Sequence, residues 1–515
     1  MSSGPIDMRL LKVSPAALRY VIGTGIAQAV ETALVVLRGL LLGTLTAAAI
    51  TEFPMFHVKP SLLGALAATV LAHGGLAWVR NAWAARAAGA TIHQLRTVAV
   101  KALRNHDPRD ISAEAARWTV TLGRELEGLR PYLAEYIPAL VAVCLSTPTA
   151  LAVIFYLDRP AGWLALSTIP LIPIFMILIG KLTQRHTQAR LAAASALQHR
   201  LADILGGAQT LRRYHREQAP RRELETAGTG HANTTMGVLR LAFLSSFALE
   251  FLATLSVALV AVSVGLRLLD GGIELASALI VLIIVPEVYA PLRAVGTSFH
   301  AAAEGTTAAA EALALIDTRA PCGGYRSISD EVACTNLSVS GREGQTPREL
   351  SFSAPRGTIT VLSGPNGSGK STTLLAIAGL LPDAKVSGNV EAPQHLAYLP
   401  AVPVWLSGSV TDNIVELGAS KQSASQVLGE LSLDISSDEP RSLSTGQAHR
   451  VAIARTLAHE HTEAVLLDEP SAHLSPELVE DLISVLHAET ERGVCVIVAS
   501  HDPRLHAIAD QVVTL

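Results

Sequence analysis

A glycine-rich run in the last third of the chain has the residue types and spacing that bind nucleotide phosphates. It fits the pattern G-x-x-x-x-G-K-[ST] and consists of Gly364, Pro365, Asn366, Gly367, Ser368, Gly369, Lys370 and Ser371, with Thr372 following. An apolar stretch typical of a buried strand precedes it, and a helix-forming stretch follows. A turn between strand and helix directs backbone N–H groups and the positive helix end at phosphate oxygens. We therefore expect this loop to bind ATP, with Lys370 at the β- and γ-phosphates and the Ser371 hydroxyl on Mg²⁺.

Three later segments carry further polar residues at the ends of expected elements. Ser444, Gly446 and Gln447 precede a helical stretch and predict a second anion site at its N-terminus. The apolar run 464–467 leads into Asp468 and Glu469. Asp468 would bind Mg²⁺ through water, and Glu469 would polarise a water for attack on the γ-phosphorus.

A last apolar run, 496–499, ends shortly before His501. This histidine would contact the γ-phosphate. With Lys370 and Glu469 it completes the expected catalytic set. Each segment is ordinary on its own, but their order and spacing together indicate an ATPase.

Composition indicates a membrane protein. The 515 residues are 50% hydrophobic and 16% charged, and the mean hydropathy is +0.37, which is unusually apolar for a soluble protein. The net charge of −4 argues against a nucleic-acid-binding surface, which normally needs a basic footprint. The four cysteines have neither C-x-x-C spacing nor the arrangement of a disulfide framework.

The apolar residues gather into six expected membrane spans within the first 300 residues. These spans cover residues 16–48, 61–88, 133–157, 161–182, 241–269 and 274–298. The long polar segments 89–132 and 183–240 are helix-prone, and the second is rich in arginine. Because positive residues stay on the cytoplasmic side, both segments and both chain ends are expected inside the cell.

The expected fold is therefore a multidomain membrane protein. Residues 1–316 form an all-α transmembrane domain with six helices and two long cytoplasmic loops. Residues 317–330, which contain proline, glycine and serine, read as a linker. Residues 331–515 alternate between strands and helices and predict an α/β P-loop ATPase domain.

These motifs, in this order after six spans, resemble the ATP-binding-cassette (ABC) family, and the resemblance covers the whole chain as an exporter-type half-transporter. It implies that the run 443–447, LSTGQ, is the signature motif, usually LSGGQ. The signature would complete the ATP site of an opposite subunit, so two nucleotide domains must dimerise.

The chain departs from the family pattern at three positions. Ala401 stands where the family places a glutamine that touches Mg²⁺. Gly341 lies where an aromatic residue usually stacks on adenine, and Ser475 replaces an aspartate after Glu469. We expect a competent but slowed ATP site in an asymmetric dimer.

The last span identifies a narrower resemblance. Its sequence, P-E-V-Y-A-P-L-R at 286–293 and G-T-S-F-H-A at 296–301, is similar to the CydD-type subunit of the heterodimeric exporter needed to assemble cytochrome bd. The resemblance implies a CydC-like partner, location in the inner membrane, and export of small thiols (cysteine, glutathione) or handling of haem.

Several ionisable residues lie in or beside the expected spans. Such groups usually face a cavity or pair with one another, and they suggest a functional site. Glu31, Arg38, His73, Glu250, Glu287, Arg293 and His300 make up this set. His300, beside Phe299, has the chemistry of a haem axial ligand, although a hydrogen-bonded histidine at the end of a span is an equal interpretation.

Two other functions remain open from sequence. One is a lipid, peptide or drug exporter half, which would need a large apolar cavity. The other is an ATP-gated redox or haem sensor that uses the nucleotide domains as a switch without net transport. Accumulation of substrate in vesicles would separate transport from sensing.

Overall fold

The computed structural model describes residues 9–10, 14–51, 60–216, 218–317, 321–341, 344–433 and 438–515. The chain divides into two compact units. The first comprises the described residues up to Ala99 together with Arg117–Ile316, and the second comprises Val100–Ala116 together with Asp317–Leu515. Each unit is described by itself below.

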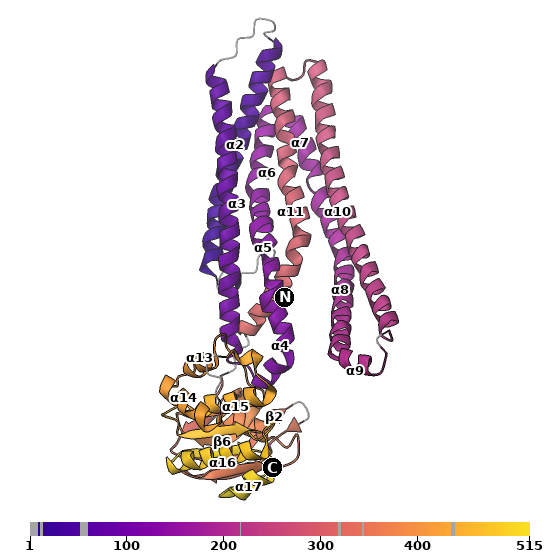
Figure 1. Ribbon diagram of the computed structural model, residues 1–515. Coiled ribbons are helices and arrows are strands. Elements are labelled where there is room, and N and C mark those ends of the chain that lie inside the picture. Colours follow the sequence, from indigo (N-terminus) through magenta and orange to yellow (C-terminus); the bar gives the residue numbers. More distant parts are fainter. Residues whose placement is uncertain are drawn as a thin grey trace. The chain divides into compact units, whose positions relative to one another are not determined.

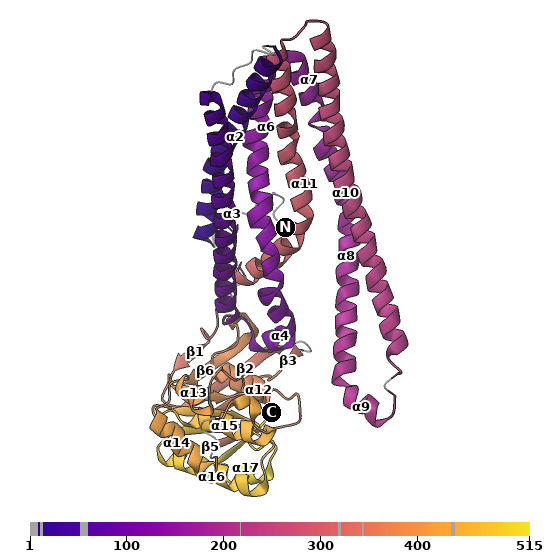
Figure 2. The same cartoon turned by 45° about the horizontal axis from the view of Figure 1, so that its top comes forward.

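The first unit is built from helices (Figures 1 and 2). Its elements, some of which extend into the second unit, are α2 (Pro15–Thr51), α3 (Pro60–Leu103), α4 (Pro108–Gly123), the short turns η1 (Glu125–Gly128), α5 (Leu129–Pro131) and η2 (Tyr132–Tyr136), α6 (Ile137–Leu157), α7 (Arg159–Thr168), α8 (Leu171–Gly206), α9 (Ala208–Arg213), α10 (Arg221–Leu269) and α11 (Leu275–Asp317). The described residues contain six helical segments long and apolar enough to cross a membrane. The predicted six-helix transmembrane domain is therefore confirmed.

Several of these helices are longer than a bilayer requires. The 49 residues of α10 would extend over about 70 Å, compared with roughly 30 Å of hydrocarbon. Its N-terminal part coincides with the arginine-rich segment expected outside the membrane. α8 and α10 run side by side and are joined through α9 (Figures 1 and 2). The polar segment 183–240 therefore continues the membrane helices as a helical pair.

Glycines let α2 and α11 approach closely. A Cβ atom on Gly39 would lie 2.8 Å from Cγ1 of Ile284, and Gly43 faces Ile280 in the same way. Small residues at such interfaces let helix backbones come together, which favours dispersion contacts in a membrane. This packing fixes the register of the two helices.

The second unit contains two sheets. One has the order β10-β5-β9-β8-β7 and is entirely parallel; the other has the order β1-β6-β2-β3, with β4 also paired to β2. The strands are β1 (Arg326–Ile328), β2 (Val332–Gly341), β3 (Gly344–Gln345), β4 (Leu350–Ala354), β5 (Ile359–Ser363), β6 (Val386–Ala392), β7 (Leu396–Leu399), β8 (Ala464–Asp468), β9 (Cys495–Ala499) and β10 (Gln511–Thr514).

Helices complete this α/β unit. They are α12 (Lys370–Ile377), η3 (Asp383–Lys385), α13 (Val410–Val415), α14 (Lys421–Glu430), η4 (Pro440–Ser442), α15 (Thr445–Leu457), α16 (Pro476–Glu491) and α17 (Pro503–Ala507). Strands β8 and β9 are buried along their whole length, as expected for a parallel sheet covered on both faces. Two apolar clusters provide that cover. The predicted α/β ATPase domain is confirmed.

One part of the expected linker is structured. Residues 326–328 form β1, which pairs in parallel with β6 through Arg326 opposite Val390. The segment is therefore part of a sheet of the α/β unit. Glycine and proline in the run 317–330 gave it the composition of a linker, but strand pairing with a distant segment decides its structure.

Candidate functional site

The predicted phosphate loop connects β5 to α12 and depends on glycine backbone geometry. Gly367 and Gly369 have φ angles of +85° and +104°, in the left-handed region that favours glycine. Gly369 is also the residue before α12, and a Cβ there would lie 2.8 Å from the nitrogen of Pro347. Both strain and crowding therefore require glycine at this position.

The loop places several donors together. The Lys370 side chain is almost buried, and its Nζ donates to the carbonyl oxygens of Gly364 at 2.8 Å and Pro365 at 3.3 Å. The buried Ser368 Oγ has no hydrogen-bond partner among the described residues. An unpaired buried hydroxyl is costly unless a ligand satisfies it. The positions of Lys370 and Ser368 therefore fit a phosphate group bound in the loop.

The side chains of Ser371, in the first turn of α12, and Asp468, at the end of β8, are in contact. The Ser371 hydroxyl donates to Asp468 Oδ1 at 3.0 Å. Burial raises the pKa of Asp468, the negative charge of Glu469 adds to the rise, and the Ser371 hydrogen bond and the Lys370 charge oppose it. A hydroxyl and a carboxylate are the hard oxygen ligands that Mg²⁺ prefers. The pair therefore fits a magnesium site beside the phosphate loop.

Glu469 and His501 follow two neighbouring parallel strands, β8 and β9. The Glu469 backbone has a φ angle of +50°, and its N–H donates to the Ala499 carbonyl at 2.8 Å. Its Oε2 lies 3.0 Å from His501 Nδ1. The His501 side chain is 80% exposed, so this pair lies where a ligand can reach it.

The predicted signature residues form a separate group at the start of α15. Ser444 is the N-cap residue: its hydroxyl accepts from the Gln447 N–H at 3.3 Å, and its own N–H donates to Gln447 Oε1 at 3.0 Å. This reciprocal arrangement is a capping box. In the described part of the chain, no hydrogen bond joins Ser444, Gly446 or Gln447 to the phosphate loop.

A buried histidine that the sequence did not single out ties this helix to the strand-end acids. His449 Nε2 lies 3.0 Å from the Pro470 carbonyl, and its ring meets that of His473 edge-on at 6.2 Å. Burial lowers the pKa of His449, and the Pro470 carbonyl partly opposes this. Its place two residues after Gln447 could have marked it in the sequence, but the contact with Pro470 is seen only in the fold.

The three departures from the family pattern lie in or beside loops. Ala401 is exposed just after β7, and the same loop is fixed by Arg455, which donates to the Val404 carbonyl at 2.7 Å and covers the ring of Trp405. Gly341 ends β2 opposite Gly344, and Ser475 precedes α16.

A short segment between the second and third spans belongs to the α/β unit. Asp107 is buried and accepts hydrogen bonds from Arg109 and from Lys385 Nζ at 2.8 Å, while Lys385 also reaches Asp110 at 2.6 Å. Arg109 in addition donates to the Ser340 carbonyl at 3.1 Å. These hydrogen bonds attach residues 107–110, part of the expected cytoplasmic segment 89–132, to the sheet that contains β2 and β6.

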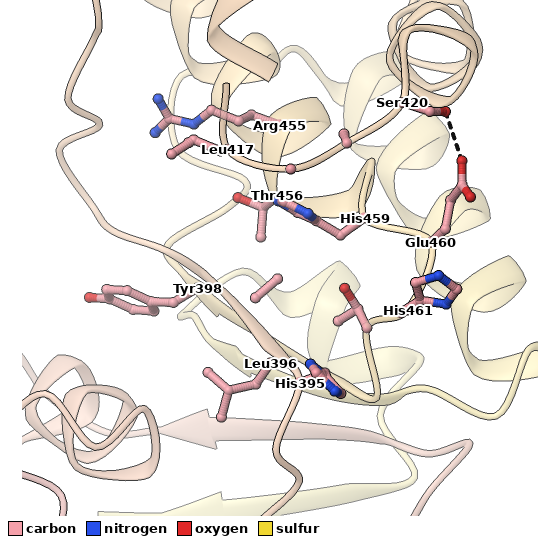
Figure 3. A pocket seen from close by; sticks show the side chains of 14 residues that line it. His395, Leu396, Tyr398, Leu417, Ser420, Arg455, Thr456, His459, Glu460 and His461 are labelled. Atoms are coloured by element: carbon pink, nitrogen blue, oxygen red, sulfur yellow. Dashed lines mark hydrogen bonds between the residues drawn. The ribbon is translucent and has the colours of Figure 1, made fainter. Parts of the chain in front are cut away.

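One pocket of the α/β unit lies away from the phosphate loop. It has a volume of about 660 Å³ and lies at the N-terminal ends of β7 and β8, on the sheet edge opposite the phosphate loop (Figure 3). His395, His459 and His461 line it, with Glu460 bonded to Ser420. No group of three or more His, Cys, Asp or Glu side chains that could hold a metal ion occurs among the described residues.

A cavity of about 500 Å³ lies among α2, α3, α6 and α11. Four of the predicted intramembrane residues line it: Glu31, Arg38, His73 and Glu287. Two other residues of the predicted set, Arg293 and Glu250, do not line this cavity, and they form an ion pair with each other at 2.6 Å. The backbone of His300 is part of α11, but its side chain lies outside the described residues.

Comparisons with known proteins agree with this arrangement. Residues 347–472 match the family "ABC transporter", and residues 20–286 match "ABC transporter transmembrane region". The chain is 32% identical to the glutathione/L-cysteine transport system ATP-binding/permease protein CydD of Escherichia coli, over 73% of this chain and 71% of that protein.

Two further comparisons extend the likeness. The chain is 30% identical to the corresponding CydC protein of Bacillus subtilis, over 78% of this chain and 75% of that one. Its fold resembles a bacterial Atm1-family ABC exporter with ATP bound, with a TM-score of 0.78, 19% identity and coverage of 96% of this chain and 93% of that one.

Proposed function

Because this chain belongs to the ABC transporter family, we propose that it is one half of a heterodimeric exporter that uses ATP to move small thiols such as cysteine and glutathione. The chain is a multi-pass membrane protein with an ATPase domain. The thiol substrates, the second half-transporter and location in the bacterial inner membrane are the parts that we propose, guided by the CydD and CydC relatives.

The observation that carries the proposal is the cluster at the phosphate loop, where Ser371 donates to Asp468 at 3.0 Å beside the buried Lys370. We assign phosphate binding to the loop 364–372 and to Lys370. Ser371 and Asp468 would hold Mg²⁺, which neutralises charge on the β- and γ-phosphate oxygens. Glu469 would orient and deprotonate the attacking water, and His501 would contact the γ-phosphate.

The signature group supports pairing with a second half. Ser444, Gly446 and Gln447 lie at the start of a helix whose N-terminus suits an anion, yet they make no hydrogen bond to this chain's own described phosphate loop. We propose that they bind the nucleotide held by the partner. The partner's signature would in turn complete the site built on Lys370.

Haem stays a second possible cargo or ligand. The proposal that His300 binds its iron rests on the resemblance and on the chemistry of histidine. Titration with haem of His300→Ala against the unchanged chain tests it, since loss of the Soret shift would support ligation. An unchanged shift would exclude His300 as the ligand.

Uptake by inverted membrane vesicles tests thiol transport. Vesicles from cells that express the chain and its partner should accumulate labelled cysteine or glutathione when ATP and Mg²⁺ are supplied. Vesicles carrying Lys370→Ala should not accumulate either thiol, because the phosphate loop loses its cation. Equal accumulation by the two preparations would contradict the proposal.

A further inference from the structure

The membrane cavity among α2, α3, α6 and α11 contains two ion pairs, and this number of charges within spans is unusual. Charged side chains are costly at membrane depth and usually mark a substrate pathway. Four of the charges form two pairs: Arg38 Nη2 lies 2.9 Å from Glu287 Oε1, and Arg80 pairs with Glu31. The cavity therefore presents equal numbers of positive and negative groups from these four residues. Glu135 also lines the cavity, at its α6 side.

The two pairs differ in how firmly they are held. Arg80 and Glu31 are 23% and 14% exposed, and Glu31 also lies 3.5 Å from His73 Nε2. Arg80 reaches Gln28 Oε1 at 3.4 Å, and Gln28 in turn donates to Ser146 at 3.1 Å. This pair belongs to a polar network that spans three helices. Breaking it would leave several buried groups unsatisfied.

Arg38 and Glu287 have no such network among the described contacts. They are 31% and 34% exposed and share a single hydrogen bond of 2.9 Å. Residues 31 and 38 are seven positions apart on α2, so Arg38 lies about 10 Å along the helix from Glu31. The more open pair bridges α2 and α11, at the level where Gly39 and Ile284 fix the register of these helices.

Glu287 offers a second acceptor besides its carboxylate. Pro291, four residues further along α11, has no N–H, so the Glu287 carbonyl loses its normal helical donor. Glu287 and Pro291 both line the cavity. A carboxylate together with a carbonyl that lacks its usual helical donor suits an ammonium group, which carries three donors.

We propose that this cavity binds the α-amino-acid end of its cargo by exchange with the Arg38–Glu287 pair. The cargo carboxylate takes the place of Glu287 at Arg38, and the cargo ammonium takes the place of Arg38 at Glu287. A zwitterion makes this exchange without leaving an unpaired charge in the membrane. An anion without an ammonium would leave Glu287 unpaired, which is costly in a buried site.

The Arg80–Glu31 network then acts as the fixed wall of the cavity. The volume of about 500 Å³ lies in the usual range for small-molecule pockets, about 300–1,000 Å³. The rest of the lining is mostly alanine, valine, proline and isoleucine, with Thr32, Asn81 and Glu135 as further polar residues, and we place the thiol end against its apolar part. This inference rests on the proposed thiol transport and adds the part of the cargo that is recognised.

The test compares cysteine with two analogues that each lack one charge. Cysteamine has no carboxylate, and 3-mercaptopropionate has no ammonium. ATP-driven uptake in vesicles should show a KM for cysteine at least tenfold below that of either analogue. Arg38→Gln should raise the KM for cysteine to the value that the unchanged chain shows for cysteamine. Glu287→Gln should raise it to the value that the unchanged chain shows for 3-mercaptopropionate.

Two further variants serve as controls. Arg38→Lys keeps the charge and should keep the discrimination against cysteamine. Arg293→Gln removes a cation of α11, the helix that carries Glu287. Arg293 pairs with Glu250 outside the cavity, and its replacement should leave the KM for cysteine within twofold. An equal effect of Arg293→Gln would overturn the inference, because the effect would not be specific to the cavity.

Three other outcomes would contradict the proposed exchange or separate it from thiol transport. A site for anions alone would show an unchanged or lower KM for cysteine in Glu287→Gln, which contradicts the exchange. If the unchanged chain transports no thiol, thiol transport fails as the function, and binding of labelled cysteine to the full complex in nanodiscs then decides the inference separately. Absence of binding, or equal competition by cysteine and both analogues, would overturn it.

Discussion

His501 Nδ1 lies 3.0 Å from Glu469 Oε2, although the two residues follow different strands and are 32 positions apart. The pairing depends on β8 and β9 being neighbours in the parallel sheet, since Asp468 lies opposite Ala499. It brings together the residue that we propose as the general base, Glu469, and the residue that we propose to contact the γ-phosphate, His501. The contact is a close approach of the carboxylate and the ring nitrogen and not a hydrogen bond, because Glu469 Oε2 is buried without a hydrogen-bond partner among the described residues.

Glu469→Gln should abolish most ATP hydrolysis. The amide keeps the shape of the side chain but cannot accept a proton from water, and general-base contributions are typically 10²–10⁴-fold. Phosphate release by the purified complex measures the effect. Glu430→Gln, an exposed change on α14, is the matched control and should have no effect; unchanged turnover in Glu469→Gln would assign hydrolysis to the partner's site.

Gly341→Tyr should tighten ATP binding. The position ends β2, and a Cβ there would meet only the Gly344 carbonyl, at the ordinary contact distance of 3.4 Å. An aromatic ring that stacks on adenine contributes about 1–3 kcal/mol, by analogy with base stacking in nucleic-acid complexes. The Kd for ATP, measured in the Glu469→Gln background, should fall at least fivefold. An unchanged Kd would mean that adenine lies elsewhere.

Asp107→Asn should weaken attachment of the segment 100–116 to the α/β unit. The variant loses charged hydrogen bonds from Arg109 and Lys385, worth about 1.5–3 kcal/mol each. Thermal unfolding of the purified complex should occur at a lower temperature, with a smaller effect for Asp110→Asn because the Asp110 side chain is 53% exposed. Equal effects of the two changes would contradict the central role of Asp107.

The same aspartate predicts a pH dependence. Burial alone would raise the pKa of Asp107, but the hydrogen bonds from Arg109 and Lys385 outweigh it and lower the pKa to about 2. A carboxyl pKa lowered by folding stabilises the folded state above the normal pKa of about 4. Its contribution is lost as the pH falls from about 4 through 2. Stability curves of the unchanged chain and Asp107→Asn should converge in that range.

His449 should make stability fall at a milder acidity. Burial lowers its pKa below the usual 6.5, so the folded state favours the neutral ring, and stability declines as the pH drops below about 6.5. His449→Gln should reduce the change in unfolding temperature between pH 7.5 and 5.5. His395→Gln, near the opposite edge of the sheet, is the control. Identical pH profiles for the unchanged chain and His449→Gln would contradict this role.

Local sequence patterns predicted the architecture well. The glycines of the phosphate loop, the apolar runs and the long polar insertions each depend on neighbouring residues, so the six helices and the α/β unit could be identified in advance. The composition of the segment 317–330 predicted a linker and did not indicate the strand within it. Residues 326–328 become β1 because they pair with β6, more than 60 positions further along the chain.

Contacts between distant residues could not be predicted in this way. Arg38 and Glu287 are 249 positions apart, and Asp107 and Lys385 are 278 apart. The sequence marked Glu31, Arg38, His73 and Glu287 as ionisable groups in spans, but it did not indicate which would share a cavity. Arg80 also lines that cavity and was not singled out, although it lies in the expected span 61–88 and carries the same signal. Gln28 and Ser146 have uncharged side chains and gave no such signal.

The most direct test of the account measures ATP hydrolysis and thiol accumulation together in the same inverted vesicles. We predict that the unchanged chain and its partner accumulate cysteine or glutathione in proportion to ATP consumed, and that Glu469→Gln abolishes most of both. Hydrolysis without accumulation of either thiol would contradict thiol export and would favour a sensor or another cargo. Accumulation that continues in Glu469→Gln would show that this chain's own site does not drive transport.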